Sequence, residues 1–499
     1  MVGRHARRWL LGVAIATALA EGLAGAPGGA GAAVTEGERR WIVGARAFED
    51  GLYDIAWLEL GRFVELMPAD PRRGDATFLR GKSAYVLGRY AEALSEFQTA
   101  ETYPLRVTTP GEPIFWQAET LFRLKRLDEA RDKYTLFLRG YPQSIYAPDA
   151  LYAGGLAELD LGRSDEAMAS FARLLRDYPK SERAAPATYS LARELVRLKR
   201  WTDAFPLLAS FPSRYPGSSY TGEVRYLLGL AQLETGRTAE GLRTLEQYIV
   251  SDPQSDVIPS ARFLVAETQV KAGRPQAALD QYQTLVRTAP PGHPLVPQAL
   301  YQIGDLSVRV GRPADAEAAW TRIRRDFPQD PYAGPAGVQL ATLYVKRRQL
   351  DAAMQIAQAV AEERGGERLT ALLLLGESAL QARRTDEAAQ AYRAVVAEAP
   401  GDSPDRFRGL AGVALAAEVQ KDVPAAKEAY QQIVAGAGDP DLVRWAKGRL
   451  LALAAPGSTP PTDVAPRRQT TPPRDESPAR QVPKPRSKPA PPVQSGSGS

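Results

Sequence analysis

The stretch GKSAYVLGRYAEALSEF, residues 81–97, contains the pattern from which the fold follows. It places a small residue, Gly81, seven positions before the turn at Gly88, and Ala93 five positions after it. Related turns recur along the chain, with six successive intervals of 37 residues and later ones of 35 to 38. A period of this length indicates one repeated supersecondary unit. The turn positions are Gly51, Gly88, Lys125, Gly162, Lys199, Gly236, Gly273, Gly311, Arg348, Arg383 and Lys421.

Two columns of small residues flank these turns. The position five residues after each turn holds Ala in every repeat except one, where it holds Gly241, and the position seven residues before holds only Gly or Ala. Two helices whose axes cross at about 8 Å leave no room for larger side chains. The position nine residues after the turn is mostly bulky, as at Phe97 and Phe171. The pattern therefore predicts a helix, a turn and a second helix in each repeat.

Neither helix of such a unit buries its apolar face alone, so the units must stack. Proline closes many second helices, as in the YP pairs that begin at 141, 178 and 215. The prediction is an all-α solenoid over residues 34–455, with about eleven helix-turn-helix repeats and a capping helix at 441–455.

The chain resembles tetratricopeptide repeat proteins. The family signature is matched by Gly81, Gly88, Ala93, Phe97 and Pro104, again by Gly155, Gly162, Ala167, Phe171 and Pro179, and in most other units. The resemblance implies a right-handed superhelix whose first helices line a concave face. The linkers of the type YPxS, such as 141–144, resemble those of periplasmic repeat proteins of the outer-membrane barrel-assembly and cell-division coordinator type.

Residues 76–83, ATFLRGKS, fit a relaxed nucleotide-binding pattern. A phosphate-binding loop must lie between a buried strand and a helix, so that its N–H groups converge on the phosphates. Gly81 belongs to the small column, which places this segment inside a first helix. The sequence therefore predicts no nucleotide binding here.

Residues 1–33 have the layout of a cleavable export signal. Three arginines precede the apolar run WLLGVAIATALA, and a small, Gly-rich segment follows. The chain has no cysteine, so it is expected to be a soluble periplasmic protein and not a lipoprotein, with association to the outer membrane left open. With two histidines and no cysteine, neither a metal site of the usual His/Cys type nor another cofactor is expected.

The formal charge of +5 lies mainly at the two ends of the chain. Residues 34–455 carry 53 basic and 54 acidic side chains, so no nucleic-acid surface is expected. Residues 456–499 contain twelve prolines and are basic, which is typical of a disordered arm. Two interpretations of this arm stay open, peripheral contact with the anionic envelope and simple solubilisation.

One inner-face position of the first helices is aromatic in eight successive repeats. Such rings offer large contact areas to an extended peptide, and they form the candidate protein-binding groove. The alternative is that they only pack neighbouring first helices together. The candidates are Trp41, Phe78, Phe115, Tyr152, Tyr189, Tyr226, Phe263 and Tyr301.

The fifth repeat departs from the pattern, because its second helix contains Pro206 and Pro212. Proline inside a helix removes a backbone hydrogen bond and clashes with the preceding turn. The sequence predicts a kink or a shortened helix near 205–212.

Three classes of function are compatible with these features. The favoured one is a non-catalytic scaffold of an envelope machine, of the outer-membrane assembly or division type, which binds protein or peptide segments in the groove. The second is an accessory to export of polysaccharide or protein through the outer membrane. The third, an envelope enzyme with paired carboxylates, is disfavoured because the 37-residue register leaves no room for an inserted catalytic domain.

Overall fold

The computed structural model describes residues 34–363 and 365–454, and every regular element in these ranges is an α-helix. The predicted export signal and the basic arm lie outside the described residues. Within them the all-α prediction is confirmed. The chain divides into two compact units, which meet in sequence at Gly236 and are described separately.

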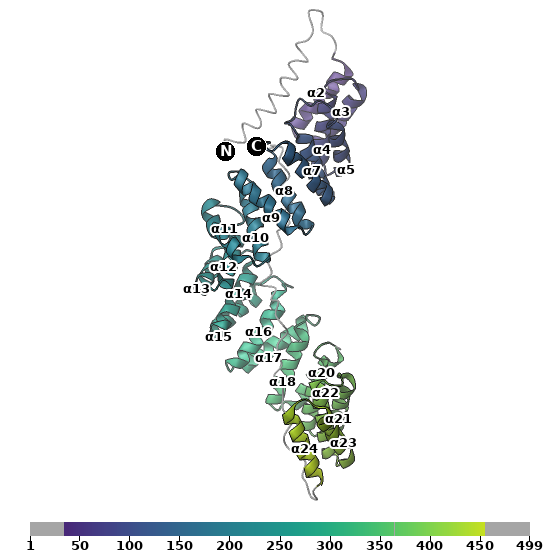
Figure 1. Cartoon of the computed structure of the whole chain (residues 1–499), viewed down its shortest axis with the longest axis vertical. Helices are drawn as coiled ribbons and strands as arrows, with labels where there is room; N and C mark the ends of the chain where they lie inside the picture. Colours follow the sequence, from purple (N-terminus) through teal and green to yellow (C-terminus); the bar gives the residue numbers. More distant parts are fainter. Residues whose placement is uncertain (1–33, 364, 455–499) are drawn as a thin grey trace, which may run out of the picture. The chain divides into compact units, whose positions relative to one another are not determined.

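The first unit comprises five helical hairpins and one further helix, which lie in chain order (Figure 1). Each helix packs against the next one in sequence, and most first helices also touch the first helix of the following hairpin. The helices are α2 (Glu36–Glu49), α3 (Tyr53–Leu66), α4 (Arg73–Val86), α5 (Tyr90–Ala100), α6 (Glu112–Arg123), α7 (Leu127–Gly140), α8 (Ala147–Asp160), α9 (Ser164–Asp177), α10 (Ala184–Arg197), α11 (Trp201–Arg214) and α12 (Thr221–Glu234).

The second unit begins with a single helix, continues with five hairpins and ends with a final helix. That last helix, α24, lies where the sequence predicts a capping helix. The helices are α13 (Thr238–Ser251), α14 (Ile258–Lys271), α15 (Pro275–Thr288), α16 (Leu295–Arg309), α17 (Pro313–Asp326), α18 (Ala333–Lys346), α19 (Leu350–Glu362), α20 (Arg368–Gln381), α21 (Thr385–Glu398), α22 (Pro404–Val419), α23 (Val423–Gly436) and α24 (Pro440–Ala454).

The column of small residues seven positions before each turn lies where the two helices of a hairpin come into close contact. A Cβ atom added to Gly81 would lie 2.8 Å from the ring of Phe97, and one added to Gly155 would lie 2.6 Å from the ring of Phe171. Both rings are fully buried. The small residue of the first helix therefore faces the bulky residue nine positions after the turn in the second helix, as the sequence pattern predicts.

All eleven turn positions have a left-handed backbone conformation. The six glycines have φ between 71° and 80°, and the five lysines and arginines have φ between 58° and 64°. After Gly88 the amide of Arg89 donates to the carbonyl of Ala84, and the amide of Gly88 donates to that of Tyr85. This Schellman arrangement satisfies carbonyl groups at the end of the first helix.

Arg383 should therefore make the protein less stable than a glycine at the same position would. Its φ is 60°, which is unfavourable for a residue with a Cβ atom. We expect Arg383→Gly to raise the free energy of unfolding by about 0.5–1 kcal/mol, and Gly88→Ala, the reverse change at another turn, to lower it by about 1 kcal/mol. Urea unfolding of the full chain measures both. A destabilised Arg383→Gly variant would contradict the backbone explanation.

The prediction for the fifth repeat is wrong. Helix α11 runs without a break from Trp201 to Arg214, with Pro206 and Pro212 inside it. Pro206 lies on the exposed side of the helix, so water can hydrogen bond to the carbonyl group that the missing N–H leaves free. The buried side of α11, formed by Ala204, Leu208 and Phe211, keeps its packing.

The segment 76–83 is helical, as predicted. It lies inside α4, where Lys82 is buried and its ammonium group is 3.4 Å from a carboxylate oxygen of Glu112. The hydroxyl of Ser83 donates to the carbonyl of Leu79. Both residues are thus engaged within the protein, and the segment has no loop that surrounds a phosphate.

Candidate functional site

The predicted aromatic positions lie mostly in the protein interior. Tyr152 is half-buried, whereas the other seven rings, Trp41, Phe78, Phe115, Tyr189, Tyr226, Phe263 and Tyr301, are between 0% and 6% exposed. Their burial favours the alternative that the sequence left open, in which the rings pack helices together. The role of these eight rings as a binding groove stays a prediction, and Tyr152 is the accessible one among them.

The rings make contacts both within a repeat and with the next one. Phe78 lies 5.6 Å from Phe97 of its own hairpin, measured between ring centroids. Phe115 stacks at 4.7 Å on Tyr146, which precedes the next first helix, and Tyr189 stacks on Tyr220 at the same distance. Such aromatic pairs stabilise the interface between repeats beyond the area that they bury.

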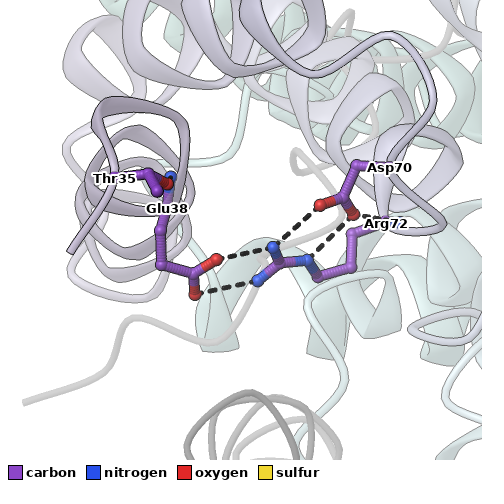
Figure 2. Close-up of polar contacts among 4 residues, drawn as sticks. All are labelled: Thr35, Glu38, Asp70 and Arg72. Carbon is purple, nitrogen blue, oxygen red and sulfur yellow. Dashed lines mark hydrogen bonds and ion pairs between the residues drawn. The ribbon is translucent and has the colours of Figure 1, made fainter. Parts of the chain in front are cut away.

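A column of acidic residues at the start of the first helices joins successive repeats. Figure 2 shows the first case, in which the guanidinium of Arg72 lies between Glu38 and Asp70. Its two terminal nitrogens bind the carboxylate of Glu38 at 3.0 and 2.7 Å, and its Nε binds Asp70 at 3.0 Å. Arg72 precedes α4, so the pair ties α2 to the next repeat.

The same contact recurs at the same offset along the first unit. Arg183, which precedes α10, donates to Asp149 of α8 at 2.6 Å, and Tyr146 donates through its hydroxyl to Glu112 of α6 at 2.9 Å. Each donor lies 34 residues after its acceptor. The sequence pattern used above does not reveal this link, but a comparison of positions 34 residues apart would reveal it.

In the fifth repeat this acidic column is interrupted. The position equivalent to Asp149 is Pro186, so Tyr220, which stands where Arg183 stands one repeat earlier, has no carboxylate there. Tyr220 instead stacks on Tyr189 and shares a hydrogen bond with Tyr152, and burial is the main cause that raises its pKa, to about 12. The first helices α8, α10 and α12 thus surround a tyrosine cluster, defined as Tyr152, Tyr189 and Tyr220.

Arg193 adjoins this tyrosine cluster. Its guanidinium carbon is 5.8 Å from the ring centroid of Tyr189, and a hydrogen bond links it to that tyrosine's hydroxyl. A second arginine, Arg183, lies 5.8 Å from the ring of Tyr152. The cluster therefore combines aromatic faces, hydroxyl groups and positive charge, which together suit recognition of polar peptide segments.

Glu119 lies deeper in the same unit. It is 6% exposed and accepts a hydrogen bond of 2.5 Å from the hydroxyl of Tyr134. Burial raises the pKa of its carboxyl group, and the charge of Asp149 adds to the effect, while the Tyr134 hydrogen bond, Arg123 and Arg183 oppose it. The raised pKa means that the ionised form is disfavoured in the native state.

This raised pKa gives a prediction for Glu119→Gln. Because the native state holds the proton more tightly than the unfolded state, the contribution of Glu119 to stability is largest at low pH and falls as pH rises through the raised pKa. The variant should therefore be more stable than the natural protein at pH 7–8, by about 1.4 kcal/mol for each unit of the shift, with no gain near pH 4. Urea unfolding at both pH values tests this, with the exposed Glu92→Gln as control. An equal gain at both pH values would be inconsistent with titration of Glu119.

His293 is half-buried, and burial lowers its pKa. Its Nδ1 accepts a hydrogen bond of 3.2 Å from the amide of Leu295, at the start of α16. Among residues 34–363 and 365–454, no group of three His, Cys, Asp or Glu side chains is arranged to hold a metal ion. In the same ranges no helix combines the length and apolar character that a bilayer crossing requires.

These features define an α-helical repeat protein whose first helices are joined by recurring polar and aromatic contacts. A family model described as tetratricopeptide repeat matches residues 46–106, 152–219, 226–294 and 338–403, and a second tetratricopeptide repeat model matches 114–144. The matches cover more than half of the chain, so the chain belongs to the tetratricopeptide repeat family. Proteins of this family generally act as non-catalytic scaffolds that bind protein or peptide partners.

The solved structures to which this chain is similar share little sequence with it. A tetratricopeptide repeat protein from Parabacteroides merdae is 16% identical, with a TM-score of 0.35, and the match covers 54% of this chain and 98% of that one. The C-terminal part of a repeat protein from Cytophaga hutchinsonii is 14% identical, with a TM-score of 0.38 and coverage of 59% and 97%. PilW, described as a type IV pilus biogenesis factor, is 17% identical, with a TM-score of 0.35 and coverage of 45% and 96%. No curated protein matches this chain significantly.

Proposed function

We propose that this protein is an exported, periplasmic scaffold of a cell-envelope machine, of the outer-membrane assembly or division type. The observation that carries the proposal is the repeat array itself, since the matches to tetratricopeptide repeats cover more than half of the chain. Arrays of this kind present extended surfaces built from many units. Export is supported by the arginines, the apolar run and the small residues of segment 1–33.

The surface that we assign to partner binding lies on the first helices of the first unit. Tyr152 is the accessible ring among the eight aromatic candidates, and it contacts Tyr220 and Arg183 of the following repeats. Aromatic and arginine side chains are enriched among residues that dominate binding energy. A partner segment laid along α8, α10 and α12 would meet all three groups.

Crosslinking in intact cells followed by purification of the tagged full-length protein tests this function. We expect discrete partners from envelope assembly or division, and loss of at least one of them when Tyr152 and Tyr220 are both changed to Ala. Both rings are partly exposed, so the change spares the fully buried core. A variant with Leu136→Ala and Ile145→Ala, which removes two exposed apolar side chains elsewhere in the unit, is the matched control.

The identity of the partners distinguishes the remaining functions. Recovery of a polysaccharide synthase or an export channel would replace the proposed role with that of an export accessory. Cell fractionation of the same strain tests the location, and a protein confined to the cytoplasm would contradict the proposal. If the natural protein and the double tyrosine variant capture identical partners, the assignment of partner binding to this surface is wrong.

A further inference from the structure

Arg193 is a buried cation without a carboxylate partner in the described part of the chain. In the ranges 34–363 and 365–454, the basic side chains with less than a tenth of their surface exposed are Lys82, at 8%, and Arg193, at 9%. Lys82 forms an ion pair with Glu112. Arg193 forms no ion pair with a described residue, and its Nη1 atom is buried without a hydrogen-bond partner.

The difference in pairing between Lys82 and Arg193 arises at equivalent positions of the repeat. Lys82 and Arg193 occupy the same column three repeats apart, and Glu223 stands where Glu112 stands relative to Lys82. Glu223 does not come within ion-pair distance of Arg193, although it is buried on the neighbouring helix α12. Glu194, the residue next to Arg193, is held by Arg197 through two hydrogen bonds of 2.9 and 2.6 Å. The nearby acids therefore leave the guanidinium incompletely bonded.

An incompletely paired buried charge lowers stability, because its desolvation is not compensated. Guanidinium groups prefer carboxylates, which they bind with two parallel hydrogen bonds. The hydroxyl groups of the tyrosine cluster can donate to the same anion, and its rings can cover the aliphatic part of an acidic side chain. A carboxylate would supply the negative charge and the hydrogen-bond acceptors that Arg193 lacks.

We propose that Arg193 and the tyrosine cluster form a subsite for an Asp or Glu side chain of a bound protein segment. This inference rests on the proposed scaffold function and adds the chemistry of the partner. A single carboxylate fits better than a polyanion, because acidic side chains near the subsite would repel further negative charge. Glu223 acts electrostatically on Tyr189, Glu194 on Arg193, and Asp149 binds Arg183 beside Tyr152. The partner approaches from the side on which Tyr152 and Tyr220 are partly exposed.

Selection from a phage-displayed library of random dodecapeptides against the full-length protein tests the subsite. We expect the selected peptides to share an Asp or Glu, and replacement of that residue by its amide to weaken binding about tenfold or more. Arg193→Gln should weaken binding of the acidic peptides to a similar extent. Arg139→Gln, which removes an exposed positive charge from α7, is the matched control and should leave affinity unchanged.

Folding of each variant is checked by circular dichroism and thermal unfolding. Removal of an unpaired buried charge should not lower the melting temperature of Arg193→Gln. Arg193→Lys keeps the charge but loses the two-pronged geometry, so it should bind with intermediate affinity and carries the test if the Gln variant fails to fold. Inorganic phosphate and acetate are tested as competitors of peptide binding. If phosphate displaces the peptides at a lower concentration than acetate does, and this effect depends on Arg193, the assignment to a carboxylate is overturned.

Selected peptides without acids, or equal affinity for Arg193→Gln and the natural protein, would also overturn the subsite. These outcomes are separable from failure of the proposed function. If the cellular partners remain bound to Arg193→Gln, the scaffold function stands and the subsite is wrong. If the natural protein captures no cellular partner, the scaffold function fails whatever the peptides show.

Discussion

Gly155→Ala should lower the free energy of unfolding by about 1–3 kcal/mol, whereas Gly154→Ala, at the adjacent residue, should raise it by about 0.5–1 kcal/mol. A Cβ on Gly155 would lie 2.6 Å from the ring of Phe171, which is fully buried, so the ring would have to shift. A Cβ on Gly154 would lie 3.6 Å from Tyr134, which is an ordinary contact. The opposite signs follow because only Gly155 belongs to the small column.

Hydrogen exchange of α8 and α9 in the full chain measures this pair of variants. Repeats open partly independently of one another, so the local free energy of opening reports the change most directly. Faster exchange in Gly155→Ala and slower exchange in Gly154→Ala are expected. Equal effects of the two changes would show that close helix crossing at Gly155 does not limit the fold.

Arg449→Met should release the final helix α24 from the repeat before it, at a cost of about 3–5 kcal/mol. Arg449 donates through Nε to a carboxylate oxygen of Glu418 at 3.2 Å, and its Nη2 makes a second bond to the other oxygen. The Glu418 side chain is only 3% exposed, so loss of Arg449 would leave a buried negative charge. The remaining hydrogen bond from the Tyr430 hydroxyl, at 2.7 Å, does not neutralise that charge.

The exposed pair of Arg444 and Asp441 on the same helix is the matched control. Arg444→Met should change stability by less than about 1 kcal/mol, because water already solvates both charges. Adding Glu418→Gln to Arg449→Met should restore most of the loss, since it removes the unpaired charge. Hydrogen exchange of α24 measures all three variants, and full protection of α24 in Arg449→Met would contradict the assigned role of the ion pair.

Most of the repeat structure could be predicted from the sequence because its constraint is steric and local. Gly81 belongs to a column of small residues that allows two helices to cross closely, and Phe97 belongs to a column of bulky residues that fills the space between them. The spacing of these columns therefore predicts both helices and the turn between them. The same columns placed ATFLRGKS inside a helix despite its match to a nucleotide-binding pattern. The left-handed turn at Gly88 recurs even where the residue is Lys or Arg, because backbone geometry is set by the whole hairpin.

Features that depend on the surroundings of a residue could not be predicted in the same way. Pro206 is tolerated because the helix face that carries it is exposed, which the sequence of one repeat does not reveal. The aromatic column identified first-helix positions but not their burial, because neighbouring repeats cover Phe115 and Tyr189. Nothing in the sequence sets Arg193 apart from other arginines of the first helices, and only the structure shows that it lacks an ion pair with any described residue.

The central claim is that the first helices α8, α10 and α12 present a surface that binds partner proteins. Photo-crosslinking in living cells tests it directly, with p-benzoyl-phenylalanine placed at Tyr152 or, as control, at the exposed Leu136 of α7. We expect a discrete crosslinked protein at 152 that is absent at 136 and can be identified by mass spectrometry. Absence of any crosslink at 152, or the same products at both positions, would contradict it.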